Sequence, residues 1–253
     1  MSKIIDCVSY NGERELFEIR YNILKDYVDE FIVVEFDKTF SGKSKEWEMI
    51  YEGVKPKVSW KGVTEDVYSK YRELAENSPN TKGAEHWKLE FMQKESIKDC
   101  LTHLKDDDIV FIGDCDEIWN PEMRYTLFTF TSKLLLKVYT YYLNNRSNEV
   151  FRGTLVSIYG QIKNECLNHL RANTESTQLG GWHFTSMHHQ LAKKLTDSYT
   201  EEDYANPRVL NELQSNIENN RDFLSRNFTY KVDESQWPDY LKENREKYLH
   251  LLK

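Results

Sequence analysis

Three acidic residues directly follow an apolar run near the middle of the chain. The run covers residues 109–112, and Gly113 then precedes Asp114, Asp116 and Glu117. Because side chains alternate along an extended backbone, the spacing of Asp114 and Asp116 predicts that both carboxylates point the same way. Carboxylates aimed at one point repel each other unless a cation lies between them. The cluster therefore predicts a site for Mg²⁺ or Mn²⁺ that carries a phosphate-bearing substrate.

The same residues also have a plainer interpretation as a turn that ends the strand, with Asp114 capping the next helix. Their position after a buried strand favours the site, because open α/β sheets bind ligands at the carboxyl ends of their strands. Gly113 would let the backbone approach such a ligand closely.

A second candidate is the stretch Gly180-Gly181-Trp182-His183. Two adjacent glycines permit an unusual backbone and a close approach to a ligand. Neutral imidazole is a frequent metal ligand, so His183 could complete a metal shell with the two aspartates. The alternative is a structural histidine with satisfied hydrogen bonds.

Polar residues also follow the first two predicted strands. Ser9, Tyr10 and Asn11 come after the first strand, and Glu35 ends the second. In doubly wound sheets such positions line a nucleotide crevice, and an acid after the second strand can accept hydrogen bonds from a ribose or base. Each is equally interpretable as an ordinary polar loop residue.

Three basic residues are candidates for contact with a diphosphate. Lys88 and Lys94 lie on a predicted long helix, and Arg20 lies on the first predicted helix. The alternatives are surface lysines and an arginine that pairs with a neighbouring acid.

The spacing of apolar residues predicts the elements that must position these side chains. A strand at 3–8, a helix at 13–25 and a strand at 31–34 form a βαβ unit, so the sheet begins parallel. Further predicted elements are a helix at 85–104, the central strand at 109–112, an antiparallel strand pair at 133–143 and 154–159, and helices in the carboxyl third. These patterns predict an α/β protein with a mostly parallel sheet, an antiparallel extension and flanking helices.

Bulk composition limits the function classes. The chain has 253 residues, of which 39% are hydrophobic and 30% charged, with a net charge of −8. The acidic balance argues against nucleic acid as a partner. No apolar run approaches the roughly 18 residues of a membrane span, and no signal peptide is recognisable. The four cysteines are scattered along the chain, which indicates reduced thiols. We therefore expect a soluble, cytoplasmic enzyme.

Several blocks of the sequence together resemble glycosyltransferase family 17, the family of the bisecting β-1,4-N-acetylglucosaminyltransferase. The resemblance covers most of residues 4–200 in the family's order. Its blocks are Asp6-Cys7 with Asn11, Glu13 to Arg20, Val33-Val34-Glu35, Thr39 to Lys43, Asp114 to Ile118 with Pro121, Tyr141 to Asn144, Arg152-Gly153, and Gly180 to Phe184.

The resemblance implies a GT-A fold, a Rossmann-like nucleotide-sugar-binding sheet whose DxD motif holds a divalent metal against the donor diphosphate. It covers a catalytic domain that we place at residues 1–205, and the helical pattern of the carboxyl third predicts an extension at 206–253 packed on the same domain. Asp116 would be the direct metal ligand, and Asp114 would contact ribose or metal-bound water. Gly113 and Cys115 would belong to the same cofactor-binding turn, and His183 would add a metal or diphosphate contact.

The implied activity is metal-dependent transfer of a sugar from UDP-GlcNAc or UDP-Glc to a glycan or other hydroxyl acceptor. The family inverts the anomeric centre, which requires a carboxylate base. Glu117 and Glu165 are candidates by acidity alone. One alternative is a non-catalytic nucleotide-sugar or carbohydrate-binding protein. A second is a DxD phosphohydrolase of the haloacid dehalogenase type, but that type places its motif after the first strand. A third is a sugar-nucleotidyltransferase, which would need a glycine-rich phosphate loop.

Overall fold

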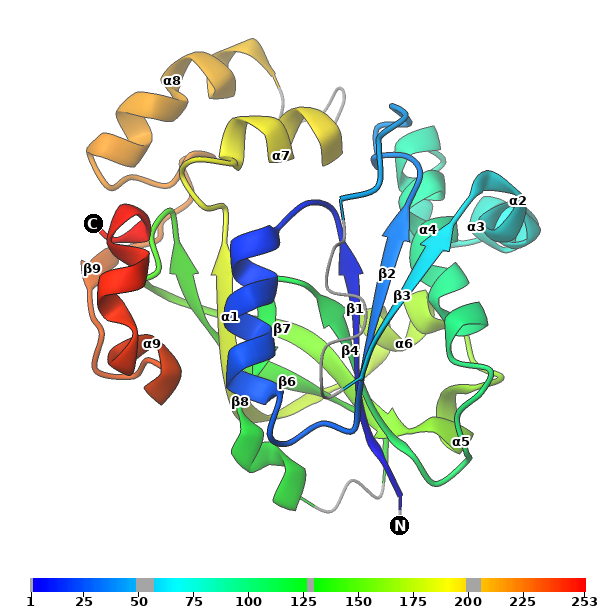
Figure 1. Cartoon of the computed structure of the whole chain (residues 1–253). Coiled ribbons are helices and arrows are strands. Elements are labelled where there is room, and N and C mark those ends of the chain that lie inside the picture. The colour runs from blue at the N-terminus through cyan, green and yellow to red at the C-terminus, as the bar shows by residue number, and fades with distance from the viewer. Residues whose placement is uncertain (1, 49–56, 127–129, 199–205) are drawn as a thin grey trace.

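A curled sheet with the strand order β3-β2-β1-β4-β7-β6-β8-β5 forms the centre of the structure, with β9 paired to β7 (Figure 1). The structure is a computed structural model that describes residues 2–48, 57–126, 130–198 and 206–253. The strands are β1 Ile4–Tyr10, β2 Glu30–Phe36, β3 Lys57–Val63, β4 Ile109–Asp114, β5 Glu117–Trp119, β6 Ser132–Thr140, β7 Asn145–Ile158, β8 Ser176–Thr185 and β9 Tyr230–Val232.

The first four strands in this order are parallel, which confirms the predicted βαβ start. β1, β2 and β4 are short apolar runs that are buried along most of their length, as expected for strands covered on both faces. Ser9 of β1 pairs in register with Asp114 of β4, so both strands end at the same edge. This edge carries the candidate site.

The antiparallel extension is also confirmed, because β7 pairs antiparallel with both β4 and β6. Its first half was missed: β7 begins at Asn145, whereas the sequence predicted a strand only from Thr154. Residues 145–149 are all polar. They therefore lack the alternation of apolar and polar residues from which a half-buried strand is predicted. Pairing with β6 and β9 holds this segment in the sheet.

Helices cover both faces of the sheet (Figure 1). Apolar residues of α1 pack with Trp237 and Leu241 on one face, and those of α4 and α6 pack on the other. The long helix predicted at 85–104 is α4, which ends at Cys100. The helices are α1 Arg14–Leu24, α2 Glu65–Tyr68, α3 Arg72–Glu76, α4 Glu85–Cys100, α5 Tyr159–Ile162, α6 Leu167–Asn173, α7 Leu191–Ser198, α8 Pro207–Glu218 and α9 Asp239–Glu243, with short 3₁₀ turns at Ser69–Tyr71, Pro79–Thr81, Pro121–Tyr125 and Arg245–Leu251.

The carboxyl third contains the expected helices, and it also adds strand β9 to the sheet. α7 and α8 share an apolar cluster with Tyr141, which follows β6. The Trp237 indole donates a hydrogen bond to the carbonyl of Leu143 at 2.7 Å, which fixes the last segment on the sheet. The domain boundary predicted at residue 205 falls outside the described residues and stays a prediction.

No helix in the described ranges combines the length and the apolar character that crossing a membrane requires.

Candidate active site

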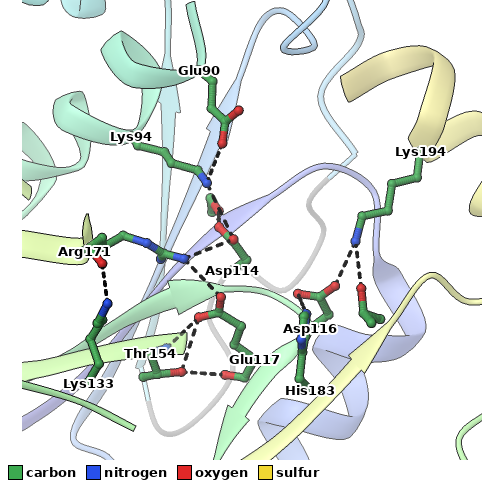
Figure 2. Close-up of polar contacts among 12 residues, drawn as sticks. Glu90, Lys94, Asp114, Asp116, Glu117, Lys133, Thr154, Arg171, His183 and Lys194 are labelled. Atoms are coloured by element: carbon green, nitrogen blue, oxygen red, sulfur yellow. Dashed lines mark hydrogen bonds and ion pairs between the residues drawn. The ribbon is translucent and has the colours of Figure 1, made fainter. Parts of the chain in front are cut away.

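The acidic motif lies where β4 turns into β5, at the carboxyl edge of the parallel strands. The prediction that Asp114 and Asp116 point the same way is wrong, because β4 ends at Asp114 and residues 115–116 form a turn. Figure 2 shows the two carboxylates meeting different basic groups. Both nevertheless line one cavity of about 360 Å³.

Asp114 lies among two cations and a hydroxyl. Its carboxylate accepts a hydrogen bond from the Ser9 hydroxyl at 2.8 Å and lies 3.7 Å from the Lys94 ammonium and 3.4 Å from the Arg171 guanidinium. Burial raises the pKa of the Asp114 carboxyl, but Lys94 and Arg171 lower it by more, so the net shift is downward. Asp114 is therefore ionised and already neutralised by side chains of the protein.

Asp116 is buried and contacts one histidine and one lysine. Its two oxygens lie 3.4 Å from Nε2 of His183 and 3.0 Å from the Lys194 ammonium. Burial raises the pKa of Asp116, and the opposing effects of Lys194 and His183 lower it well below the usual range. β5 pairs with β8 so that Glu117 lies opposite His183, and this register brings the imidazole to the motif.

Glu117 is fully buried beneath the two aspartates. Its carboxylate accepts a hydrogen bond from the backbone N–H of Thr154 at 2.8 Å and one from Arg171 at 3.0 Å. A Cβ at Gly113 would lie 2.7 Å from a Glu117 carboxylate oxygen, and one at Gly153 would lie 3.0 Å from the carboxylate carbon. Gly113 thus makes room for Glu117 and does not line the cavity. The expected approach of its backbone to a ligand stays a prediction.

Neither carboxylate named from acidity as a base fits that role. Glu117 has its oxygens occupied by Arg171 and Thr154. Glu165 is exposed and does not line the cavity.

The glycines before His183 also have a packing role. Gly180 and Gly181 lie within β8 and have no positive φ, so the predicted unusual backbone is wrong. A Cβ at Gly181 would lie 2.2 Å from the carbonyl oxygen of Ile118, and one at Gly180 would lie 2.9 Å from Leu134. The pair allows β8 to approach its neighbours closely, which in turn places His183.

The structure brings most of the predicted site residues together. Those that line the cavity are Ser9, Tyr10, Asn11, Lys94, Asp114, Asp116, Glu117 and His183. Gly113, Cys115, Arg20, Glu35 and Lys88 do not line it.

Arg20 is a buried structural residue. Its guanidinium binds both carboxylate oxygens of Asp6, at 2.7 and 2.6 Å, and donates to the backbone carbonyls of Glu117 and Asp114 at 2.6 and 3.2 Å. Arg20 therefore stabilises the backbone of the acidic motif from within the core. Because its side chain is not exposed, it does not reach the cavity in the way that the sequence predicted.

Glu35, Lys88 and Cys115 are likewise turned away from the cavity. The buried Glu35 carboxylate accepts hydrogen bonds from Lys45 at 2.7 Å and from Trp60 at 3.0 Å. Lys88 lies 3.6 Å from Glu85 on its own helix. The Cys115 thiol is buried at the turn, where burial raises its pKa.

Sequence reasoning missed Arg171 and Lys194. Arg171 comes from α6, where Lys133 donates to its backbone carbonyl at 2.6 Å, and Lys194 comes from α7. Figure 2 shows Lys94, Arg171 and Lys194 reaching the two aspartates from three different helices. Neither missed residue belongs to a motif, and a lysine or arginine on a short helix gives no signal of a contact so distant in sequence.

The predicted metal set is only partly assembled. Asp116 and His183 face each other, but within the described ranges no three His, Cys, Asp or Glu side chains form a group that could hold a metal ion. Asp114 is held apart by Lys94 and Arg171. A carboxylate and an imidazole still fit a divalent cation whose remaining ligands are substrate phosphates and water.

Comparison with known proteins adds a family to this geometry. The model of the family described as glycosyltransferase family 17 matches residues 1–253. Among solved structures, apo mouse xyloside xylosyltransferase 1 is similar with 6% identity and a TM-score of 0.34, covering 67% of this chain and 71% of that chain. Comparison with curated proteins gave no match.

Proposed function

This chain belongs to glycosyltransferase family 17 and is a glycosyltransferase, and we propose that it transfers the sugar of UDP-GlcNAc or UDP-Glc to a hydroxyl of a glycan acceptor with inversion. The observation that carries this proposal is the cavity at the carboxyl edge of the sheet, where Lys94 and Lys194 flank the carboxylates of Asp114 and Asp116. Such a site suits a diphosphate whose charge grows as the sugar leaves.

The nucleotide part of the donor binds over β1 and β2. Ser9, Tyr10 and Asn11 line this side of the cavity together with Thr39 and Gln93. Polar groups at the carboxyl ends of neighbouring parallel strands are where doubly wound sheets bind nucleotides. Asp114 lies at the boundary between this side and the metal site, so it can contact the ribose or a metal-bound water.

Asp116 and His183 would hold Mn²⁺ or Mg²⁺ beside the diphosphate. When bound, the cation would neutralise charge on the departing UDP. Lys194 already lies 3.0 Å from Asp116 and 3.4 Å from the hydroxyl of Thr185, so α7 places a second positive charge next to the same carboxylate. Lys94 supplies a positive charge from the opposite side, beside Asp114.

Removal of one carboxylate tests this assignment. We expect Asp116→Ala to weaken Mn²⁺-dependent UDP binding at least about 100-fold in calorimetry, since even residues that only support a metal ligand are worth about 10–100-fold. The matched control is Asp239→Ala, which removes an exposed aspartate paired with Lys242 at the start of α9. UDP affinity in Asp116→Ala equal to that of the control would contradict the proposed metal site.

Donor turnover separates a transferase from a binding protein. Wild-type protein should release UDP from a UDP-sugar in the presence of Mn²⁺. A protein that binds the UDP-sugar tightly and never releases UDP would instead be a nucleotide-sugar-binding protein.

A further inference from the structure

Inverting transfer requires a base on the side of the sugar that faces the acceptor. The acceptor oxygen forms a bond to the anomeric carbon while the bond from that carbon to the diphosphate oxygen breaks. The acceptor proton must pass to a nearby base, and the electron pair leaves with UDP. The base therefore lies across the sugar from the diphosphate, and finding it rests on the function proposed above.

The first half of β7 occupies that side of the site. β4 pairs with β7 only at the end of β7, where Ile112 lies opposite Leu155 and Ile109 opposite Ile158. β7 therefore extends past the carboxyl end of β4, on the side away from β1. β4 lies between β1 and β7 in the sheet (Figure 1), so the acidic motif at its carboxyl end lies between the end of β1, where we place the nucleotide, and this projecting half of β7. A sugar attached to that nucleotide would extend towards β7.

The first half of β7 places one carboxylate in this region. Phe151 and Gly153 share a face, since side chains two apart lie on the same side of a strand. The pairing of β7 with β6 changes register between Val150 and Arg146, so Glu149 is placed by the cavity that it lines. Gly153 faces the carboxylate of Glu117, and the Phe151 ring lies 4.3 Å from the His183 ring, centroid to centroid. Glu149 lies two residues before Phe151, and it lines the cavity together with Phe151 and His183.

The other carboxylates that line the cavity have partners within the described residues. Asp114, Asp116 and Glu117 are each paired with a basic side chain. Glu90 lies 2.8 Å from Lys94, and Asp197 lies 3.6 Å from Lys43. Glu13 accepts a hydrogen bond from the backbone N–H of Asn11 at 2.6 Å, and burial raises its pKa. Its charge interacts with Asp116 and Lys194, so it lies on the side where we place the diphosphate and not across the sugar from it.

Glu149 differs from these residues because its carboxylate has no hydrogen bond and no ion pair with any described part of the chain. The positive side chain near it, Arg226, also lines the cavity but is paired with Asp222 at 2.7 Å. A carboxylate with free oxygens that faces a substrate cavity can accept a proton, whereas one that is held by a cation is a poor base.

We propose that Glu149 is the catalytic base that removes the proton from the acceptor hydroxyl. The acceptor would then bind between the projecting half of β7 and the region around α7, where Phe151, Gln190 and Phe223 line the cavity. Carboxylate oxygens and exposed aromatic faces are suited to a sugar hydroxyl and its ring.

Substitution of Glu149 tests this role with water as the acceptor. We expect Glu149→Gln to bind UDP with Mn²⁺ as the wild type does. We expect it to release UDP from a UDP-sugar at least about 100-fold more slowly, because general-base catalysis contributes about 10²–10⁴-fold. The control is Glu73→Gln on α3, an exposed residue outside the cavity, which should keep the wild-type rate.

Azide distinguishes a lost base from lost structure. Azide is already an anion, so it can attack the anomeric carbon and displace UDP without giving up a proton. We expect azide to accelerate UDP release by Glu149→Ala, with formation of a glycosyl azide, and to have little effect on the wild type. Wild-type UDP release by Glu149→Gln, loss of UDP affinity, or absence of azide rescue in Glu149→Ala would each overturn the assignment. A wild-type protein that neither binds nor turns over UDP-sugars would overturn the proposed function itself.

Discussion

At the scale of single residues, Asp114 and Asp116 have separate surroundings although they are only two positions apart. Asp114 faces Lys94 and Arg171, and Asp116 faces His183 and Lys194. Only Asp116 thus combines a carboxylate with a neighbouring imidazole. This difference is the reason why we propose Asp116 as the direct metal ligand, with Asp114 contacting the ribose or a metal-bound water.

If Asp116 binds a metal ion as proposed, Lys194 competes with that ion for the same carboxylate. We predict that Lys194→Met binds Mn²⁺ about threefold more tightly, because a partly exposed ion pair is worth up to about 1 kcal/mol, which is about fivefold in affinity. UDP release should be slower, since a positive charge beside the leaving diphosphate is lost. Calorimetry with Mn²⁺ measures the first effect, with Lys163→Met as the control because Lys163 pairs with Asp106 away from the cavity. Weaker Mn²⁺ binding would show that Lys194 supports the ligand and does not compete with the metal.

The acidic residues of this site could be predicted from the sequence, whereas two of its basic residues could not. Asp114 and Asp116 were identifiable because a buried strand runs directly into them. Lys194 and Arg171 were not, because their contacts span 78 and 57 positions of the chain and depend on how α7 and α6 pack. Arg20 was assigned to the cofactor because its pairing with Asp6 cannot be read from spacing alone.

At the scale of elements, the close packing of β5 against β8 sets the position of His183. Glu117 lies opposite His183, and Trp119 lies opposite Gly181. The Cβ positions at Gly181 and at Gly113 are filled by neighbouring atoms. Glycines that look like ligand-binding residues in the sequence are here required by strand packing, so the two explanations cannot be separated without the fold.

A methyl group at Gly181 should disturb this pair of strands. We predict that Gly181→Ala lowers the free energy of unfolding by about 3 kcal/mol, because its Cβ would lie 2.2 Å from the carbonyl oxygen of Ile118 and backbone cannot move aside cheaply. Denaturant titration measures the change. Leu179→Ala is the control on the same strand, since this side chain is exposed and should cost little. Equal stability of the two variants would refute the packing explanation.

At the scale of the whole molecule, the sheet and its two covering layers follow from patterns in the sequence. The βαβ start, the central strand and the antiparallel extension are as predicted. The projecting half of β7 was not predicted, because residues 145–149 are polar and gain their place only by pairing with distant strands. The proposed acceptor side of the cavity, including Glu149, could for this reason not be predicted from the sequence.

The central claim is that this edge of the sheet binds a UDP-sugar together with a divalent cation. A thermal-shift titration of the wild-type chain with UDP-GlcNAc and UDP-Glc, with and without Mn²⁺, tests it directly, because a ligand that binds only the folded state raises the unfolding temperature. We predict a clear rise in Tm with a UDP-sugar and Mn²⁺ together, larger than with either alone and absent for Asp116→Ala. The same Tm with and without the UDP-sugar, whether or not Mn²⁺ is present, would contradict the account.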